Sequence, residues 1–226
     1  MAKLRSDLWA LVNNAGVCVC GLYDWQTQRQ REWQIQVNLL GTMRITKAFI
    51  PLLKRSRGRI ITVTSINGVI TYPGLSVYCA TKFGLEGFNN VLRQELGRQH
   101  GIRVITIRPG DFARATAIMA QHQKLAQEMW NEMPADQQSE DGELFHRYHE
   151  NTLKNYGLTS PPSIEGSQLL HDIKEAVLGI KPKDTYLSAA FTHRIVYSIM
   201  MIVPRKWTDY VLAKLTQHIF SNRSDT

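Results

Sequence analysis

The sequence has few cysteines and no long hydrophobic run. Its three cysteines, Cys18, Cys20 and Cys79, are too few and too irregularly spaced for a disulfide framework or a C-x-x-C metal site. No stretch approaches the roughly 20 apolar residues that a membrane-spanning helix needs. Residues 1–12, MAKLRSDLWALV, lack the charged head, apolar run and small-residue cleavage site of a secretory signal. These features favour an intracellular, reducing environment and predict no bound metal.

Acidic residues are outnumbered: 19 carboxylates stand against 27 lysines and arginines, which gives a net charge of +8. Such an excess can attract nucleic acid or an anionic membrane surface, or can simply keep a protein soluble. The densest cluster, KRSRGR at residues 54–59, is interpreted as the solvated end of a helix. We therefore expect no nucleic-acid partner.

At 226 residues and 43% apolar content, the chain suits a single domain covering residues 1–226. Short β-branched or continuously apolar runs alternate with longer stretches of helical periodicity, which is typical of parallel βαβ units. The expected fold class is α/β, a doubly wound parallel sheet with helices on both faces. The predicted strands are residues 8–12, 59–65, 102–107 and 185–189, and the predicted helices include residues 24–57 and 77–96.

The helix predicted over residues 24–57 shows an apolar spacing of three and four residues, as expected of a helix that buries one face. Gly58 follows it and is placed to end it. The face that this spacing predicts to be buried consists of Val37, Gly41, Ile45, Phe49 and Leu52.

A tyrosine and a lysine lie four positions apart near the start of the helix predicted over residues 77–96. Tyr78 and Lys82 therefore share one helix face. Ser65, thirteen residues before Tyr78, stands at the end of the predicted strand 59–65. Ligands of parallel sheets bind outside the carboxyl ends of the strands, so these three side chains are candidates for a catalytic group.

A second Tyr-x-x-x-Lys pair, Tyr210 and Lys214, has different surroundings. It follows no predicted strand, and the residue thirteen positions before Tyr210 is Tyr197. We interpret this pair as ordinary helix surface.

The chemistry of the first pair requires a perturbed tyrosine. A free tyrosine has a pKa near 10, about three units too high for acid–base catalysis at neutral pH. Lowering it to about 7 requires roughly 4 kcal/mol of stabilisation of the phenolate, to which a lysine one turn away contributes. Ser65 is placed to hold a substrate oxygen against Tyr78. Alternatively, Ser65 only caps a helix, and Tyr78 and Lys82 form a surface pair.

Five segments, NNAG, VNLLGT, VTSINGV, YCATKFG and RPG, occur in the order and spacing of the short-chain dehydrogenase/reductase family, which the chain resembles over residues 8–116. The resemblance implies a Rossmann-like fold and hydride transfer between a secondary alcohol or ketone and NAD or NADP, with NAD favoured. It also implies a small-molecule substrate and a homo-oligomer.

The resemblance assigns roles residue by residue. Tyr78 would be the acid–base, Lys82 would tune it and hold the cofactor ribose, and Ser65 would position the substrate. Asn38 would support a proton-relay water, although a satisfied helix amide is the alternative. The expected cofactor contacts, besides Tyr78 and Lys82, are Asn14, Ala15 and Gly16 on the adenine-ribose side and Pro109, Gly110 and Phe112 beside the nicotinamide.

Within the family, the segments FIPLLKRSRGRIITVTS, PGDFARAT and LAQEMWNEMP look most like the branch of D-β-hydroxybutyrate, retinol and 17β-hydroxysteroid dehydrogenases. We expect a small 3-hydroxy acid such as D-β-hydroxybutyrate as the substrate, with a retinoid or a steroid as the alternative. Arg114 is a candidate partner for a substrate carboxylate, because a guanidinium matches its geometry; it could equally face solvent or pair with an acidic residue.

One family feature is missing from the sequence. The glycine-rich phosphate loop, T-G-x-x-x-G-x-G, should precede NNAG by a long stretch, but only twelve residues precede Asn13 and the motif occurs nowhere. The N-terminal strands of the fold would be missing with it, leaving residues 8–12 at a sheet edge. We expect a fragment, a shortened isoform or an incomplete gene model: either the catalytic part of an oxidoreductase or a non-catalytic dimerisation partner.

Residues 117–184 are expected to form a lid over the substrate, although their methionines and aromatic residues also suit simple packing. His146 and His149 have one-turn spacing for metal ligands but no convincing further ligand. Residues 190–220 contain an apolar run, 195–203, followed by basic and aromatic residues. This composition suits a helix lying in a membrane interface or packing on a partner subunit. Association with a mitochondrial or endoplasmic-reticulum membrane is therefore open.

Overall fold

Four parallel strands form the centre of the protein, in the spatial order β1-β2-β3-β4. The structure, a computed structural model, describes residues 7–110, 112–113, 116–156 and 164–220. All four predicted strands are confirmed, with ends that differ by at most two residues. They are β1 (Ala10–Asn13), β2 (Arg59–Val63), β3 (Arg103–Pro109) and β4 (Thr185–Ser188).

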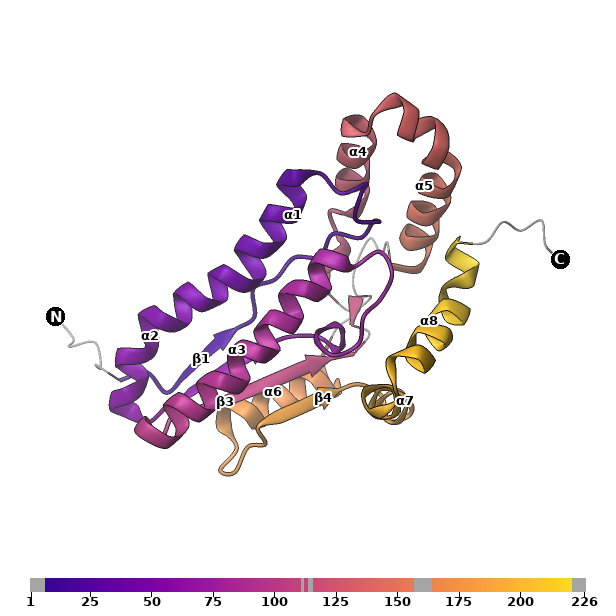
Figure 1. Ribbon diagram of the computed structural model, residues 1–226. Coiled ribbons are helices and arrows are strands. Elements are labelled where there is room, and N and C mark those ends of the chain that lie inside the picture. The colour runs from indigo at the N-terminus through magenta and orange to yellow at the C-terminus, as the bar shows by residue number, and fades with distance from the viewer. Residues whose placement is uncertain (1–6, 111, 114–115, 157–163, 221–226) are drawn as a thin grey trace.

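Helices connect and flank these strands (Figure 1). In chain order they are α1 (Gln28–Gln34), the π-helical segment η1 (Ile35–Gly41), α2 (Thr42–Ser56), η2 (Ile66–Gly68), α3 (Ser76–His100), η4 (Ala117–Met119), α4 (His122–Glu132), α5 (Ala135–Tyr156), α6 (Gln168–Leu178), α7 (Phe191–Ile202) and α8 (Arg205–Phe220).

The two faces of the sheet are covered by different helices. Successive side chains of a strand point to opposite faces, and in β2 both Ile60 and Ile61 are fully buried. Ile60 belongs to a cluster with Leu53 of α2 and Leu92 of α3. Ile61 belongs to another, with Leu169 of α6. The expected α/β sheet with helices on both faces is therefore confirmed.

The first helix begins later than predicted. It starts at Gln28 rather than near residue 24, because Thr27 caps it: the Thr27 hydroxyl accepts a hydrogen bond from the Gln30 amide at 3.2 Å, and the Gln30 side chain accepts one from the Thr27 amide at 3.3 Å. This reciprocal pair satisfies backbone donors that the first turn leaves free. The helix then runs through η1 into α2 without a break.

The predicted apolar face of this long helix is buried only in part: Phe49 packs against the cluster that contains Leu53 and Ile60. Ile45 is 47% exposed, whereas the buried side is mainly polar. Its polar groups find partners: the Gln34 side-chain oxygen accepts from the Val19 amide at 3.1 Å, and the Gln30 amide nitrogen donates to the Leu125 carbonyl at 2.9 Å. Buried polar groups need such partners. The buried polar side chains are Gln30, Gln34, Asn38, Thr42 and Thr46.

Two residues after α2 have roles other than those predicted. The left-handed residue that ends α2 is Arg57, with φ of 49°, and not Gly58. Glycine is required at position 58 because a Cβ there would lie 2.6 Å from the carbonyl oxygens of Leu8 and Trp9.

Arg59 is also not part of a solvated basic cluster, since it is only 5% exposed. Its guanidinium donates to the carbonyls of Ala176 (2.8 Å), Val177 (2.9 Å) and Gly179 (2.6 Å) at the end of α6. A cation is favoured there by the partial negative charge of the helix C-terminus.

Helices α4 and α5 lie beyond the carboxyl ends of the strands, to which the arrowheads point in Figure 1. Their methionines and aromatic residues form one buried cluster with residues of the segment after β1, including Val19, Cys20 and Trp25. The methionines and aromatic residues of α4 and α5 therefore serve in packing, the alternative that the sequence left open. Helix α6, which the expected lid range 117–184 included, instead packs on β2, β3 and β4.

The C-terminal apolar run and the basic residues after it form two helices, α7 and α8, separated at Pro204. Helix α7 has no buried residue, whereas α8 packs against α5. Among the described residues, no helix is long and apolar enough to cross a membrane.

Candidate active site at the strand ends

The predicted catalytic residues lie together at the carboxyl ends of the strands. Tyr78 and Lys82 stand on the first turns of α3, and Ser65 follows β2. Asn38 is in η1, which contacts α3. All four are buried, with exposed fractions of 7%, 4%, 7% and 0% in the order Tyr78, Lys82, Ser65 and Asn38. A π-helical turn within an α-helix frequently marks a functional site.

Lys82 is fixed by the end of β2. Its ammonium nitrogen donates a hydrogen bond to the carbonyl of Val63 at 3.1 Å and lies 5.6 Å from the centre of the Tyr78 ring. Burial lowers its pKa to about 8, while the charges of Cys18 and Glu86 oppose that shift. Lys82 is therefore a buried cation beside the tyrosine.

The pKa of Tyr78 differs from the expectation that Lys82 brings it towards 7. Burial raises it well above its ordinary value, and the nearby Cys18 adds to the rise. A hydrogen bond from Ser65, which favours the phenolate, opposes both. Desolvation of the phenolate outweighs the favourable contacts, so the buried phenol retains its proton at neutral pH.

Ser65 makes two contacts that the sequence left as alternatives. Its hydroxyl accepts a hydrogen bond from the Asn67 amide at 3.1 Å and so caps η2. The same side chain lies close enough to Tyr78 to lower the pKa of its phenol. The cap fixes the hydroxyl in place beside the phenol.

The Asn38 side chain clamps the backbone that follows β1. Its amide nitrogen donates to the Val17 carbonyl at 2.9 Å and to the Thr81 hydroxyl at 3.1 Å, and its oxygen accepts from the Val17 amide at 2.8 Å. Thr81 in turn donates to the Tyr78 carbonyl at 2.7 Å. The Asn38 side chain therefore ties the segment after β1 to the start of α3.

The segment Asn14, Ala15 and Gly16 is exposed directly after β1. A Cβ on Gly16 would lie 3.6 Å from the Lys82 ammonium and 3.5 Å from the Asn38 side-chain oxygen, which is ordinary contact distance. The protein's own packing therefore does not require a glycine here, and its small size leaves space next to Lys82 for a ligand.

The predicted nicotinamide-side residues stand at the end of β3 and beyond it. Pro109 is the last residue of β3, and Gly110 donates to the Ser188 carbonyl at 2.8 Å. A Cβ on Gly110 would lie 2.9 Å from that of Ala189, so packing explains this glycine. Phe112 packs against the hydrophobic cluster beneath α6. Arg114, the predicted carboxylate partner, lies outside the described residues.

Sequence reasoning missed a buried ion pair one turn beyond Lys82. Glu86 accepts two hydrogen bonds from the Arg108 guanidinium, at 2.9 and 2.8 Å, and one from the Thr64 hydroxyl at 2.8 Å. Its charge supports the protonated form of Lys82. The four-residue step from Lys82 to Glu86 was the signal that could have revealed it.

The second Tyr-x-x-x-Lys pair and the histidines of the HRYH segment lie outside the group of predicted catalytic residues. Lys214 lies 5.9 Å from the centre of the Tyr210 ring, nearly as close as the 5.6 Å of the first pair, but Tyr210 is 60% exposed. The Nδ1 atom of His149 is 3.1 Å from the Nε2 atom of His122, not paired with His146. No group of three or more potential metal ligands occurs in the part of the chain that the structure describes.

The buried cation predicts a pH dependence of stability. Between about pH 8, the pKa of Lys82 in the fold, and pH 10.5, its ordinary value, the unfolded chain binds the additional proton. The free energy of unfolding should therefore rise with pH in this window, with a contribution from Lys82 that approaches about 3 kcal/mol.

Urea unfolding at pH 7.5 and 9.5 would measure this rise, and Lys82→Met should remove it. Because Cys20 and Tyr78 also have shifted pKa values, the quantity to compare is the difference between the variant and the parent. Lys214→Met, on the exposed surface of α8, serves as the control. Parallel pH profiles for parent and Lys82→Met would contradict the prediction.

Known proteins share this sequence and fold. Residues 1–126, more than half of the chain, match the family described as short chain dehydrogenase. The mitochondrial D-beta-hydroxybutyrate dehydrogenase of Rattus norvegicus is 33% identical over 80% of this chain. Short-chain dehydrogenase/reductase family 9C member 7 and 17-beta-hydroxysteroid dehydrogenase type 6, both of Bos taurus, are 31% and 32% identical over 93% and 92% of it.

The chain spans about half the length of the hydroxybutyrate dehydrogenase, 53%, and 66% and 64% of the other two relatives. A crystal structure of a short-chain dehydrogenase from Streptomyces avermitilis covers 93% of this chain and is itself covered to 68%, with a TM-score of 0.59 and 21% identity. That similarity concerns the fold.

Proposed function

The chain belongs to the short-chain dehydrogenase family, and we propose that it carries the catalytic part of an oxidoreductase acting on a secondary alcohol or ketone. The observation that supports this most is the buried group Ser65, Tyr78 and Lys82 at the strand ends. In this proposal a nicotinamide nucleotide, NAD or NADP, supplies or accepts the hydride.

We propose that Tyr78 transfers the proton. Its phenol keeps its proton at neutral pH, so it can donate that proton to a carbonyl oxygen during reduction. Ser65 would hold the same oxygen against the phenol. The cation of Lys82 would favour the phenolate left after transfer, and the Asn38 clamp would hold the segment after β1 at the site.

We propose that the cofactor's ribose side is held by Lys82 together with Asn14, Ala15 and Gly16, and its nicotinamide side by the segment of Pro109, Gly110 and Phe112. NAD is the favoured cofactor and NADP the alternative. The sequence contains no T-G-x-x-x-G-x-G loop for the pyrophosphate. The backbone amides of a helix N-terminus that usually bind this group would have to come from outside these residues.

For the substrate we propose a small 3-hydroxy acid such as D-β-hydroxybutyrate, with Arg114 as the partner of its carboxylate. Arg114→Met should then lower kcat/KM for hydroxybutyrate by about 10- to 100-fold, since a charge-assisted hydrogen bond contributes about 1.5 to 3 kcal/mol. Turnover of neutral alcohols should be unchanged.

The experiment is a panel of hydroxybutyrate, all-trans-retinol and estradiol, each with NAD and with NADP. It uses this chain and a fusion that places the N-terminal segment of the rat relative before it. A preference for retinol or estradiol would replace the small-acid proposal with the alternative. Absence of turnover by the fusion with every substrate would favour the non-catalytic dimerisation partner.

We further propose that the exposed surface of α7 and α8 is covered in the working protein, by a membrane interface or by another subunit. Ile199 is 55% exposed, Ile202 82% and Trp207 64%, and Arg205 and Lys206 stand beside them. Apolar and aromatic side chains next to cations suit an anionic lipid surface.

Ile199→Asp with Ile202→Asp should abolish the association that this surface supports. Flotation with phosphatidylserine vesicles measures membrane binding, and sedimentation velocity at several protein concentrations measures self-association. Loss of flotation alone would identify the membrane, and loss of a dimer alone the subunit contact. Unchanged behaviour in both measurements would refute the proposal.

A further inference from the structure

Two cysteine sulfurs lie side by side after β1. The Sγ atoms of Cys18 and Cys20 are 3.8 Å apart, and either thiol can donate a hydrogen bond to the other. Both are free thiols. Cys20 is buried at 8% exposure, whereas residue 18 is partly exposed.

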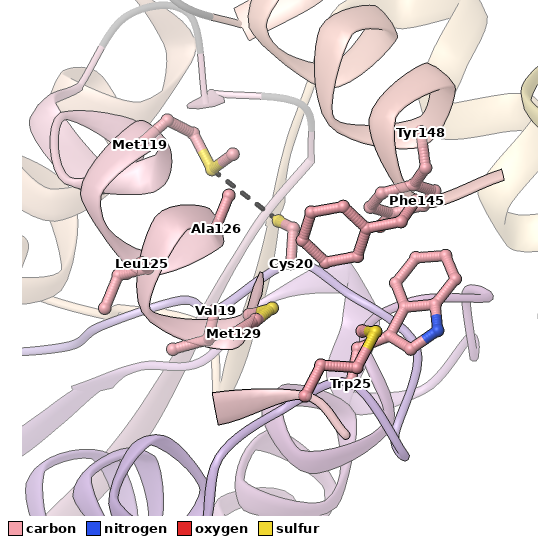
Figure 2. Close-up of a cluster of buried hydrophobic side chains, with 10 residues drawn as sticks. Val19, Cys20, Trp25, Met119, Leu125, Ala126, Met129, Phe145 and Tyr148 are labelled. Atoms are coloured by element: carbon pink, nitrogen blue, oxygen red, sulfur yellow. Dashed lines mark hydrogen bonds between the residues drawn. The ribbon is translucent and has the colours of Figure 1, made fainter. Parts of the chain in front are cut away.

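The two cysteines lie between the cluster formed by α4 and α5 and the candidate active site. The Cys20 sulfur lies 3.8 Å from the sulfur of Met119 and faces the buried cluster that includes Phe145 (Figure 2). On the other side, both cysteines are close enough to Tyr78 for a thiolate charge on either one to raise the pKa of the phenol; the hydrogen bond to Cys20 raises the pKa of Cys18 itself, so that Cys18 keeps its proton.

Hydrogen bonds at Cys20 favour a thiolate. Bonds from Cys18 and from His122 lower the pKa of Cys20, against the effect of burial. The Nε2 atom of His122 lies 3.1 Å from the Nδ1 atom of His149. Burial lowers the pKa of His149 to about 3, so this ring stays neutral, and its buried Nε2 has no hydrogen-bond partner among the described residues.

We propose that Cys18 and Cys20 form a dithiol site that a hydroperoxide oxidises to an intramolecular disulfide. The thiolate attacks one oxygen of hydrogen peroxide, the O–O bond breaks, and the sulfur becomes a sulfenic acid while the leaving hydroxide is protonated to water. The other thiol attacks this sulfur, the S–O bond breaks, and the released hydroxide takes the thiol proton as a second water. Two sulfurs lose two electrons in total, and the peroxide gains them.

Bond formation changes both neighbouring regions. An S–S bond is about 2.05 Å long, so sulfurs that are 3.8 Å apart must approach each other by more than 1.5 Å. Any movement of the Cys20 sulfur changes its 3.8 Å contact with Met119, and the Cys20 thiolate charge, which raises the pKa of Tyr78, disappears. The disulfide therefore alters the packing of the α4–α5 cluster and the electrostatics of the site together.

Peptide mass analysis of the intact, folded chain tests the proposal directly. Trypsin separates the pair, on residues 6–29, from Cys79, on residues 60–82. After mild hydrogen peroxide and then iodoacetamide, peptide 6–29 should carry no alkyl group and should have lost two hydrogen atoms. Cys79 should remain alkylated, and dithiothreitol should restore two alkylation sites on peptide 6–29.

Controls separate the folded arrangement from the mere sequence C-V-C. The protein should oxidise at least about ten times faster at pH 7 than a synthetic peptide of residues 13–23, because the fold increases the thiolate fraction. Cys79→Ser should still form the disulfide, whereas Cys18→Ser should leave a sulfenic acid on Cys20 that dimedone traps. Alkylation of both cysteines after peroxide, a bond to Cys79, or equal rates for protein and peptide would each overturn the proposal.

Discussion

Replacing Tyr78 by phenylalanine is expected to lower kcat by about 100- to 10,000-fold, the range that a positioned proton donor contributes. The ring would still fill its buried position, and only the transferable proton would be lost. Affinity for the nucleotide should change little, because the Lys82 contact with the end of β2 does not involve the phenol oxygen. Steady-state kinetics together with a nucleotide titration measure both quantities, in whichever form of the protein turns over.

The matched control is Tyr210→Phe. It changes the same residue type at the same spacing from a lysine, with a similar distance between the ring and the ammonium group, 5.9 Å against 5.6 Å. Because Tyr210 is 60% exposed and remote from the strand ends, its variant should keep full activity. If Tyr78→Phe retained more than a few per cent of the parent kcat, the acid–base role would have to be given up.

The second large effect is expected at Glu86. Glu86→Ala leaves the Arg108 guanidinium without its two hydrogen bonds in a largely buried site, where the side chains are 8% and 20% exposed for Glu86 and Arg108. Removing one partner of a buried pair costs about 3 to 5 kcal/mol of the free energy of unfolding. The pKa of Lys82 should fall as well, because the charge that raises it is gone.

Urea unfolding compares this variant with two others. The double variant Glu86→Leu with Arg108→Leu should regain much of the loss, because no unpaired charge remains. Asp184→Ala breaks an exposed pair with Arg93, whose side chains are 70% and 39% exposed, and should cost less than about 1 kcal/mol. A similar cost for Glu86→Ala and Asp184→Ala would show that the buried pair contributes no more than a surface one.

The strands could be predicted because each is a short apolar run with turn residues beside it, and the alternation with helices determines a parallel sheet. The grouping of Ser65 with Tyr78 and Lys82 followed from the rule that strand ends converge. Both predictions depend on local pattern and on one topological rule. Neither needs knowledge of which side chains meet across the molecule.

The predictions that failed required such knowledge. In the sequence Arg59 is one more charge in a basic run. In the structure it is buried because its guanidinium donates hydrogen bonds to carbonyls at the end of α6, more than a hundred residues away. The apolar spacing of Ile45 indicated a buried face, whereas the partners of Gln30 and Gln34 lie on other segments of the chain. The prediction that the pKa of Tyr78 falls was wrong, because the sequence spacing identifies the neighbouring lysine but not the free-energy cost of burying a phenolate.

The π-helical segment η1 places the buried polar residues of the first long helix on one side of that helix. In an α-helix a step of four residues overshoots a full turn by about 40°, so four steps from Gln30 would bring Thr46 nearly to the opposite side. A π-helix has wider turns of about 4.4 residues, and the same step falls short by about 33°. The two steps inside η1, from Gln34 through Asn38 to Thr42, therefore cancel the overshoot of the steps before and after it. Because of this cancellation, Gln30 and Thr46 lie on the same side of one continuous helix. Gln30 can therefore contact α4 while Thr46 contacts β1.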